Sequence, residues 1–430
     1  EGRSLMHTAI APGRLPVFGH AIALGKDPLR FLRTLPSLGP VVTIYLGPRP
    51  FFAITDPELA ISILTDQSGI FAQGAFYDAI QAVTGDGVAN IDGDRHRTHR
   101  RAMQPQFRDA RVPDYTDAMR QLATCHMQSW ETGQTIIVTE EMIRLCVTMI
   151  ASCLFSWQMD DATARQFALA LLTLVGNSTL RALFPWAAGL PLPVNRRFER
   201  AACEIIDTID AMIQRHLDTT DTQDLFTALM AAHDAEQLNH TEVRDEIRSV
   251  MIAGSETLGA TIAWILYHIT VDPDLKGRVL DEIDKATPEM PLLHRVIRET
   301  QRLHAPVMIT RKTVRRTYVG NVQLPIGGDV LLSPYLAHHN QTIYQQPDLF
   351  VPDRWLPHRS QNLPRTAFIP FGAGVHKCLG RHFAIAAIRT VVPTLLQRLN
   401  LELAPDHDAT ETVVAGTHPR HLTMTVRGRV

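Results

Sequence analysis

The sequence predicts a mainly α-helical protein with small β-sheets, and three features predict this fold class. Apolar residues recur at helical spacing over residues 241–271, until an Asp-Pro pair stops the helix. Residues 112–235 contain several further amphipathic helical patterns. The β-rich runs are short, as at residues 41–46 and 51–55. The strands are therefore expected to form small sheets beside a larger helical body.

The composition favours one large domain over several small modules. A chain of 430 residues with 45% hydrophobic content can bury a large core. We therefore expect a single domain over residues 1–430, acting as a monomer. The net charge of −2 gives no reason to expect a nucleic-acid partner. The five cysteines lack short paired spacing, which favours a reducing, cytoplasmic compartment over a disulfide framework.

The sequence gives no indication of a membrane protein. No window approaches the ~20 apolar residues that a membrane span requires, so we expect no membrane association. Because the chain begins with Glu1 rather than Met, an anchor ahead of it stays open.

The N-terminal part alternates between turns, strands and short helices. Prolines and glycines in residues 1–40 favour turns and a short helix. A Gly-Pro-Arg-Pro turn joins the first two β-rich runs as a hairpin, and residues 56–57 then open a short helix. Residues 71–88 mix glycines with apolar side chains and therefore indicate a loop. This loop is either an ordinary surface loop or a mobile one with an apolar lining.

Residues 92–107 carry a basic run on a predicted helix. Positions four apart share a helix face, so His96 and Arg100 form one pair. Arg97 and Arg101 form a second pair, turned by about 100 degrees because a helix has ~3.6 residues per turn. One pair can point inward while the other stays in water. Taken alone, such a run is also typical of a solvated helix face.

The middle of the long helix carries small residues followed by an acid and an alcohol. Thr241 can cap this helix. Glycine at Gly254 costs roughly 1 kcal/mol relative to alanine, which predicts that space is needed beside the helix there. Glu256 and Thr257 point about 100 degrees apart, so a water or a local bend must join them. The alternative is that Thr257 bonds back to the Ala253 carbonyl and that Glu256 forms a helix salt bridge.

A glycine-rich stretch near the C-terminus leads to a cysteine. Gly372, Gly374 and Gly380 permit positive φ and the close approach of a flat ligand. Cys378 lies at the mouth of a helix, where unpaired N–H groups and the helix dipole favour thiolate over thiol. A thiolate is a soft ligand that suits iron. The alternatives are an inert cysteine beside a turn and a zinc site, although no Cys-x-x-Cys partner lies nearby.

Residues 371–380 resemble the haem-binding signature of the cytochrome P450 family, Phe-x-x-Gly-x-(Arg or His)-x-Cys-x-Gly, with every specified position filled. The resemblance implies the P450 fold, in which heme b lies between the long helix and the cysteine loop. It also implies that Cys378 is the axial iron ligand, that Phe371 packs beside its sulfur and that His376 reaches a haem propionate. The residues implied to bind the cofactor are His96, Arg100, Arg311, Phe371, Gly372, Gly374, His376 and Gly380.

Two further motifs resemble those of the family, in the expected order. The Ala-Gly-Ser-Glu-Thr run is similar to the family's (Ala or Gly)-Gly-x-(Asp or Glu)-Thr, which implies that Glu256 and Thr257 are catalytic and support proton delivery to O2 at the haem. Glu299 and Arg302 stand three apart and can pair. In the family such a pair joins a later arginine in a buried structural network, and here Arg354 matches that arginine.

The implied reaction is insertion of one oxygen atom from O2 into a small, largely apolar substrate, such as a terpenoid or a polyketide intermediate. Electrons would come from a ferredoxin and its NAD(P)H-dependent reductase. Arg97, Arg101 and Lys377 would offer a basic surface to this acidic donor. Residues 169–194, interrupted by prolines, would form a movable roof, and residues 416–419 would add a last pocket contact. The implied pocket residues are Phe76, Ile80, Val83, Leu172, Leu174, Ala253, Val307 and Ile309.

Two rival function classes stay open. One is a haem-thiolate peroxygenase or isomerase without a redox partner, against which the intact Glu256 and Thr257 pair argues. The other is a haem-based sensor or binding protein, for which no partner domain is visible in the sequence. Two positions depart from the family: Ala387 stands where Glu is usual, and Pro393 predicts a kink in the last helix.

Overall fold

The computed structural model of the protein describes residues 8–184, 187–217, 223–285, 289–413 and 416–428. The helices are α1 (Ala21–Lys26), α2 (Pro28–Thr34), α3 (Pro57–Leu64), α4 (Ala75–Thr84), α5 (Gly93–Met103), α6 (Val112–Gln128), α7 (Val138–Phe155), α8 (Asp161–Leu183), α9 (Pro193–Leu217), α10 (Leu225–Asp234), α11 (His240–Val271), α12 (Pro273–Asp284), α13 (Pro291–Leu303), α14 (Pro334–His338), α15 (Pro357–Ser360) and α16 (Arg381–Arg398). Short 3₁₀ turns are η1 (Pro36–Leu38), η2 (Gln104–Phe107), η3 (Asp109–Arg111) and η5 (Pro352–Trp355).

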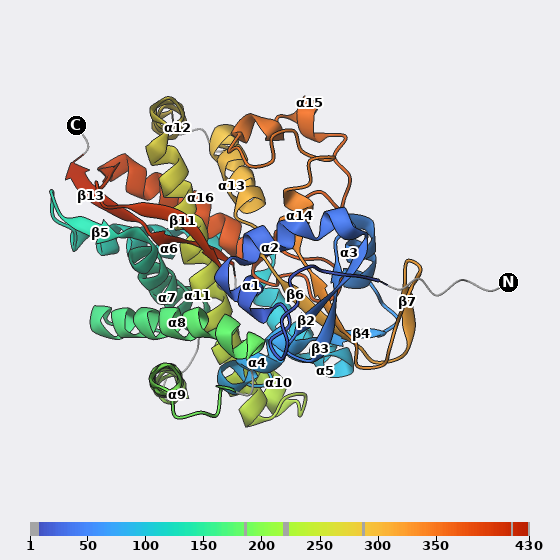
Figure 1. Ribbon diagram of the computed structural model, residues 1–430. Coiled ribbons are helices and arrows are strands. Elements are labelled where there is room, and N and C mark those ends of the chain that lie inside the picture. Colours follow the sequence, from blue (N-terminus) through green and yellow to red (C-terminus); the bar gives the residue numbers. More distant parts are fainter. Residues whose placement is uncertain (1–7, 185–186, 218–222, 286–288, 414–415, 429–430) are drawn as a thin grey trace.

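The strands are β1 (Ala9–Ile10), β2 (Val41–Leu46), β3 (Arg49–Ile54), β4 (Phe71–Gln73), β5 (Thr135–Ile137), β6 (Ile309–Thr313), β7 (Thr317–Val319), β8 (Val322–Leu324), β9 (Asp329–Leu332), β10 (Leu399–Leu403), β11 (Asp408–Val413), β12 (Thr417–His421) and β13 (Thr423–Gly428). Among the described residues the largest sheet has the strand order β1-β2-β3-β9-β6-β4, and the next has β10-β13-β5. The pairs β11-β12 and β7-β8 stand alone. Figure 1 shows α11 running through the middle, with β2 and β3 on its right and β5 and β13 on its left. The predicted mainly helical fold class is confirmed.

Several local predictions hold in the N-terminal part. The hairpin forms, with Leu46 opposite Arg49 in the β2-β3 register. Asp56 caps α3, because its carboxylate accepts a hydrogen bond of 2.9 Å from the Leu59 N–H.

Residues 71–88 are not the predicted loop. They form β4 and the ten-residue helix α4. Gly74 is required between the two, because a Cβ there would lie 2.7 Å from the Arg311 nitrogen on β6. Gly85 ends α4 with a φ of +61°. The glycines therefore mark the ends of a helix rather than a flexible segment.

Helix α11 is the core of the molecule. Its cap is Asn239 and not Thr241, since Asn239 and Glu242 form a reciprocal capping box. The helix has 32 residues, which corresponds to about 48 Å at ~1.5 Å per residue. A Cβ at Gly259 would lie 2.7 Å from the Ile143 nitrogen, so glycine allows the backbones of α11 and α7 to approach closely.

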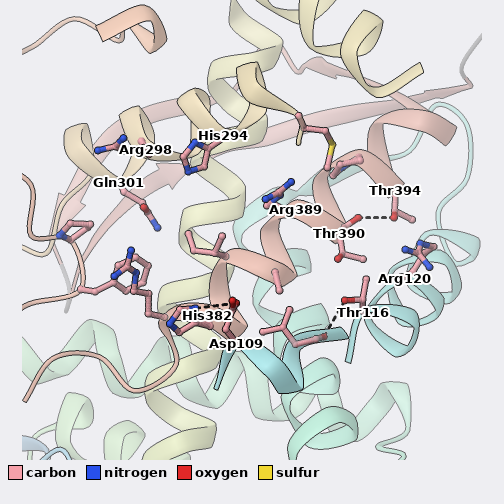
Figure 2. A pocket seen from close by; sticks show the side chains of 18 of the residues that line it. Asp109, Thr116, Arg120, His294, Arg298, Gln301, His382, Arg389, Thr390 and Thr394 are labelled. Atoms are coloured by element: carbon pink, nitrogen blue, oxygen red, sulfur yellow. Dashed lines mark hydrogen bonds and ion pairs between the residues drawn. The ribbon is translucent and has the colours of Figure 1, made fainter. Parts of the chain in front are cut away.

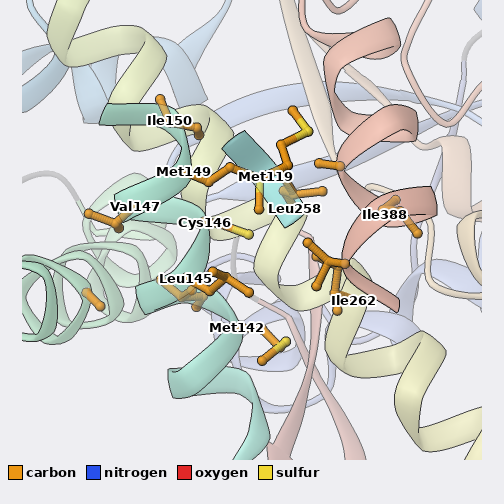
Figure 3. Packing of buried hydrophobic residues seen from close by; sticks show 14 of the residues in the cluster. Met119, Met142, Leu145, Cys146, Val147, Met149, Ile150, Leu258, Ile262 and Ile388 are labelled. Atoms are coloured by element: carbon orange, nitrogen blue, oxygen red, sulfur yellow. The ribbon is translucent and has the colours of Figure 1, made fainter. Parts of the chain in front are cut away.

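Apolar side chains fill the space around α7 and α11. Figure 3 shows Met142, Cys146 and Met149 of α7 beside Leu258 and Ile262 of α11. Met119 of α6 and Ile388 of α16 complete this part of the cluster. All of these residues are at most 5% exposed. The core thus fixes three helices, α6, α7 and α16, around the segment of α11 that carries Glu256 and Thr257.

One described helix, α11, is long and apolar enough to cross a bilayer, contrary to the sequence-based expectation that no such stretch exists. However, 67% of its most apolar window is buried inside the protein. A core helix needs the same apolar composition, which explains the length of the run.

A buried ionic network links α13 to η5, as predicted. Glu299 and Arg302 are both 0% exposed. Arg302 donates through Nε to Oε2 and through Nη2 to Oε1 of Glu299, each at 2.9 Å. Arg354 donates to Oε1 at 3.3 Å, Trp355 to Oε2 at 2.9 Å and the Val351 N–H to Oε1 at 3.0 Å. Glu299 is therefore the common acceptor of the network.

Helix α16 continues through Pro393, so this proline does not end it. Ala387 is 0% exposed and lies in the main core. The small side chain at this departure from the family pattern is therefore a packing residue. Pro185 and Trp186, within the predicted roof, lie outside the described residues.

Candidate functional site

The site is built around a ligand loop, residues 371–380, that leads into α16. The Cys378 N–H donates to the Phe371 carbonyl at 2.8 Å, which folds the loop back on itself. The Gly380 N–H donates to the Cys378 sulfur. The side chain of Cys378 is exposed to a cavity between the loop and α11. The loop therefore presents its sulfur to an internal space.

The three glycines of the loop have different reasons to be glycine. Gly372 has a φ of +66° and nothing within 4 Å of its Cβ position, so its open side faces space. Gly374 has a φ of +72°, and a Cβ there would overlap the Leu64 carbonyl. Gly380 has a φ of −81°. The positive φ that glycine permits is thus used at Gly372 and Gly374 but not at Gly380, which immediately precedes α16.

Burial raises the pKa of the Cys378 thiol, despite the Gly380 N–H and the nearby Arg100 guanidinium, which both lower it. The predicted effect of the helix end is present, because the Gly380 N–H lowers this pKa, but burial acts in the opposite direction. The helix end supplies one N–H to the sulfur, but removal of water from the anion has the larger effect. A bound metal cation would reverse this balance, because metal coordination deprotonates a thiol outright.

The cavity beside Cys378 has a volume of about 440 Å³. One wall is α11, which contributes Ala253, Thr257 and Thr261. Ile150 and Leu154 of α7 form an apolar wall next to it. The ligand loop lies along one side of the cavity, and Gly416, Thr417 and His418 also line it. The predicted contact from residues 416–419 is thus present.

One end of the cavity gathers basic side chains from α5 and the ligand loop. The rings of His96 and His376 are in contact, with centroids 4.2 Å apart and their planes tilted by 47°. Arg100 donates to the Lys377 carbonyl at 2.9 Å. Arg311 does not line the cavity but lies behind Gln73, to whose side-chain oxygen it donates at 2.5 Å.

The orientation of α5 agrees with the sequence-based prediction. His96 is 3% exposed, whereas Arg97 and Arg101 lie on the solvent side. His99 fixes the helix against α11, because its Nδ1 lies 2.6 Å from Oε1 of Glu246. Burial raises the pKa of Glu246, and the contact with His99 opposes that shift.

The charge of this basic end is poorly balanced by the protein itself. Burial lowers the pKa of His96 to about 4, and repulsion by His376 and Arg100 adds to the effect. Asp92 is a carboxylate at this end, with Oδ1 at 3.0 Å from Nε2 of His376. Burial raises the pKa of Asp92, but hydrogen bonds from His376 and the Gln73 N–H outweigh it and hold the pKa below its usual range.

These residues fit a flat dianionic iron cofactor. A soft sulfur ligand faces the cavity, Gly372 leaves its open side free, and imidazole and guanidinium N–H groups at one end can donate to anions. The two propionates of heme b would supply those anions. His96, Arg100 and His376, with Arg311 behind them, are the residues that would hold them.

The acid and the alcohol of α11 point in different directions. Thr257 faces the cavity, and its hydroxyl donates to the Ala253 carbonyl at 2.8 Å, the bond considered as an alternative from sequence. Glu256 is 3% exposed and contacts His418 of β12 rather than a neighbour on its own helix. A Cβ at Gly254 would lie 2.7 Å from Cδ1 of Ile150. The space beside Gly254 is therefore occupied by an α7 side chain.

The predicted pocket residues divide into two groups. Ala253 and Ile309 line the cavity. Val83 and Val307 are 4% and 0% exposed and belong to packed core clusters, so their assignment to the cavity wall is incorrect. Phe76 and Ile80 of α4 and Leu172 and Leu174 of α8 are also not among the residues that line it. Tyr77, Val88 and Ala89 provide the wall from this region instead.

Sequence reasoning missed Gln73, Asp92 and the contact of His418 with Glu256. Asp92 immediately precedes α5, which is a position that can be recognised from sequence. Gln73 and His418 have no local signal, because their partners lie 303 and 162 residues away. Only the folded chain brings these contacts together.

A second and larger cavity, of about 880 Å³, lies on the other side of the ligand loop and shares Phe371 and Gly372 with the first. Figure 2 shows Arg120 of α6, His294 and Arg298 of α13 and Arg389 of α16 around it. Arg381 also lines it, and Asp109 is a carboxylate among the described lining residues. This hollow is therefore basic and opens beside the ligand loop, although it does not contain Cys378.

Comparisons with known proteins agree with the geometry. A family model described as Cytochrome P450 matches residues 11–424. Cyclooctatin synthase from Streptomyces melanosporofaciens is 31% identical over 421 residues, which cover 94% of this chain and 92% of that protein. Cyclooctat-9-en-7-ol 5-monooxygenase from the same organism is 32% identical over 415 residues, covering 93% and 90%. Pentalenene oxygenase from Streptomyces avermitilis is 30% identical over 442 residues, covering 98% of each chain.

Proposed function

Because the chain belongs to the cytochrome P450 family and is a monooxygenase that binds heme b through a cysteine thiolate, we propose that Cys378 is this cysteine and that the substrate is a small, largely apolar terpenoid. A polyketide-like metabolite of similar shape is the nearest alternative. The single observation that carries the assignment of Cys378 is its exposed sulfur in the cavity between the ligand loop and α11.

The cavity wall supports an apolar substrate. Ile150, Leu154 and Ala253 face the space, and the hydroxyls of Thr257 and Thr261 are both bonded to helix carbonyls at 2.8 Å. The hydroxyl protons of both threonines are therefore already donated within the helix and are not free to bond a ligand. Two relatives named for oxygenation of pentalenene and of cyclooctat-9-en-7-ol support the terpenoid class.

The polar residues singled out by the sequence have the following proposed roles. Bound heme b supplies the activation of O2, to which its thiolate ligand contributes electron density. His96, Arg100 and His376 would orient the cofactor through its propionates, and Arg311 would act from behind them by holding Gln73. Glu256 and Thr257 move protons toward O2, with the Thr257 hydroxyl facing the cavity.

An acidic ferredoxin, reduced by an NAD(P)H-dependent reductase, is the proposed electron donor. Arg97, Arg101 and Lys377 are exposed near the ligand loop. The basic cavity that contains Arg298 and Arg381 adds positive charge beside the same loop. Complementary charge raises the rate at which such partners meet. The cytoplasmic location, the single domain and the monomeric state stay predictions of the sequence.

Ligand titration followed by product analysis tests this function. We expect apolar polycyclic terpenes to displace the water ligand of the iron and to shift its absorption band, whereas fatty acids and charged peptides should not. With a ferredoxin, its reductase, NAD(P)H and ¹⁸O-labelled O2, one labelled oxygen atom should enter the product. Spectral shifts with fatty acids or charged peptides alone would contradict the substrate class. Turnover with peroxide but not with the redox chain would contradict the proposed electron donor.

A further inference from the structure

A buried contact joins the acid of the long helix to the C-terminal strands. Nε2 of His418, on β12, contacts Oε1 of Glu256, on α11. The two residues are 4% and 3% exposed, and both border the cavity that contains Cys378. A buried carboxyl group needs a hydrogen-bonding partner, and an imidazole can provide one in either protonation state. His418 meets this need from a distant part of the chain.

The backbone of His418 is fixed by the same helix that carries Glu256. The indole N–H of Trp264, two helical turns beyond Glu256, donates to the Thr417 carbonyl at 2.9 Å. On the other side, the Thr412 hydroxyl donates to the His418 carbonyl at 3.1 Å, and these two residues face each other in the β11-β12 register. The imidazole is therefore held at Glu256 by bonds on both sides of its strand.

This contact determines where the acid of the relay points. Thr257 faces the cavity, whereas the Glu256 carboxyl group is directed to His418. Neighbouring helix residues project about 100 degrees apart, so the carboxyl group approaches the Thr257 side only by leaving or loosening its contact with the imidazole. The Oε1 atom of Glu256 is therefore in contact with a group that can donate or accept a proton.

We propose that His418 is a positioning residue for proton delivery, which holds the Glu256 carboxyl group and exchanges a proton with it. In this exchange the Nε2–H bond of the imidazolium breaks and an O–H bond forms on Glu256, so a charged pair becomes a neutral pair. A proton from solvent water then returns to the imidazole. The inference rests on the proposed relay role of Glu256 and Thr257. It assigns part of that relay to the C-terminal strands.

A double-mutant cycle on the haem-loaded protein tests the contact without using activity. The variants are Glu256→Gln, His418→Gln and the two together, each unfolded in urea. If the residues act as a pair, the unfolding constant of the double variant should change by about the same factor as in the more affected single variant. A change equal to the product of the two single effects would overturn the proposal.

Turnover measurements test the proton role, with His421→Gln as the matched control on the same strand. His421 is exposed, so its variant should stay within about twofold of the wild type. His418→Gln keeps a hydrogen-bonding group but cannot exchange a proton in the same way. We expect the rate of product formation to fall by about 10- to 100-fold. A positioned proton donor typically contributes about 100-fold or more to a rate, and His418 acts only through Glu256.

The solvent deuterium isotope effect separates a proton role from a structural one. It should rise in His418→Gln, because proton delivery becomes slower than the other steps, and stay unchanged in His421→Gln. Equal product yields and isotope effects in the two variants would overturn the proposal. If the wild type itself formed no product, the proposed function would fail instead, and the double-mutant cycle would still decide whether His418 and Glu256 act together.

Discussion

Replacing Glu299 by glutamine should remove a large part of the stability of the fold. Oε2 of Glu299 accepts from Nε of Arg302 and from the Trp355 indole, both at 2.9 Å. An amide nitrogen at that position would place its N–H groups against the N–H groups of Arg302 and Trp355. The buried Arg302 guanidinium would also lose its counter-charge. Breaking a buried ion pair from one side costs about 3–5 kcal/mol. A domain has about 5–15 kcal/mol of total stability, so Glu299→Gln should lose about a fifth of it or more.

Asp281→Asn is the matched control for Glu299→Gln. It makes the same chemical change in the pair that Asp281 forms with Lys285 on α12, whose side chains are 72% and 70% exposed. An exposed pair of this kind contributes about 0.3–0.5 kcal/mol. Urea unfolding of the haem-loaded proteins, followed by far-ultraviolet circular dichroism, measures both free energies. If the two variants lie within about 1 kcal/mol of each other, the network is not the stabilising element described above.

Three further predictions follow from particular contacts. Gly259→Ala should lose about 1–3 kcal/mol of unfolding free energy, because the added methyl group overpacks against the Ile143 backbone. The control Gly277→Ala, with nothing within 4 Å of its Cβ position, should gain about 0.5–1 kcal/mol. Equal shifts of the two variants in urea unfolding would contradict the close approach of α11 and α7. Thr257→Ala should divert NAD(P)H electrons from product to peroxide. Thr261→Ala removes a hydroxyl with the same 2.8 Å bond to a helix carbonyl and should not do so. An unchanged ratio of product formed to NAD(P)H consumed in Thr257→Ala would exclude its relay role. Burial raises the pKa of Glu411 to about 7 from a usual 4.5, so the folded protein favours the protonated carboxyl group. The free energy of unfolding is therefore highest, with respect to Glu411, below about pH 4.5. It should fall by about 3 kcal/mol as the pH rises to about 7. Glu411→Gln should flatten the urea-unfolding profile over this range, and a profile as steep as the wild type would contradict the assignment.

The sequence predicted the parts of the site that depend on short-range geometry. His96 and Arg100 lie four apart, and the period of a helix alone places them on one face. The ligand loop was recognised because its glycines and cysteine occupy ten consecutive residues. The order of Glu299, Arg302 and Arg354 indicated their network, although only the structure gives its burial.

The parts that sequence could not predict depend on the rotation of an element or on distant partners. Val83 projects into the core. The sequence pattern could not predict this, because it indicates a loop over residues 71–88 and therefore gives no rotational phase for α4. Val307 lies two residues before β6 and packs into the core, whereas Ile309, the first residue of that strand, reaches the cavity. The partner of Glu256 is 162 residues away, and no periodicity within α11 could identify it.

The most direct test of the haem-thiolate assignment is the absorption spectrum of the reduced protein with carbon monoxide. We predict that the wild type shows the red-shifted Soret band of thiolate ligation and that Cys378→Ser loses it while retaining the fold by circular dichroism. Cys146→Ser, which changes a buried cysteine of α7, should keep the band and serves as the control. A wild type without the red-shifted band, or a Cys378→Ser variant that retains it, would contradict the account.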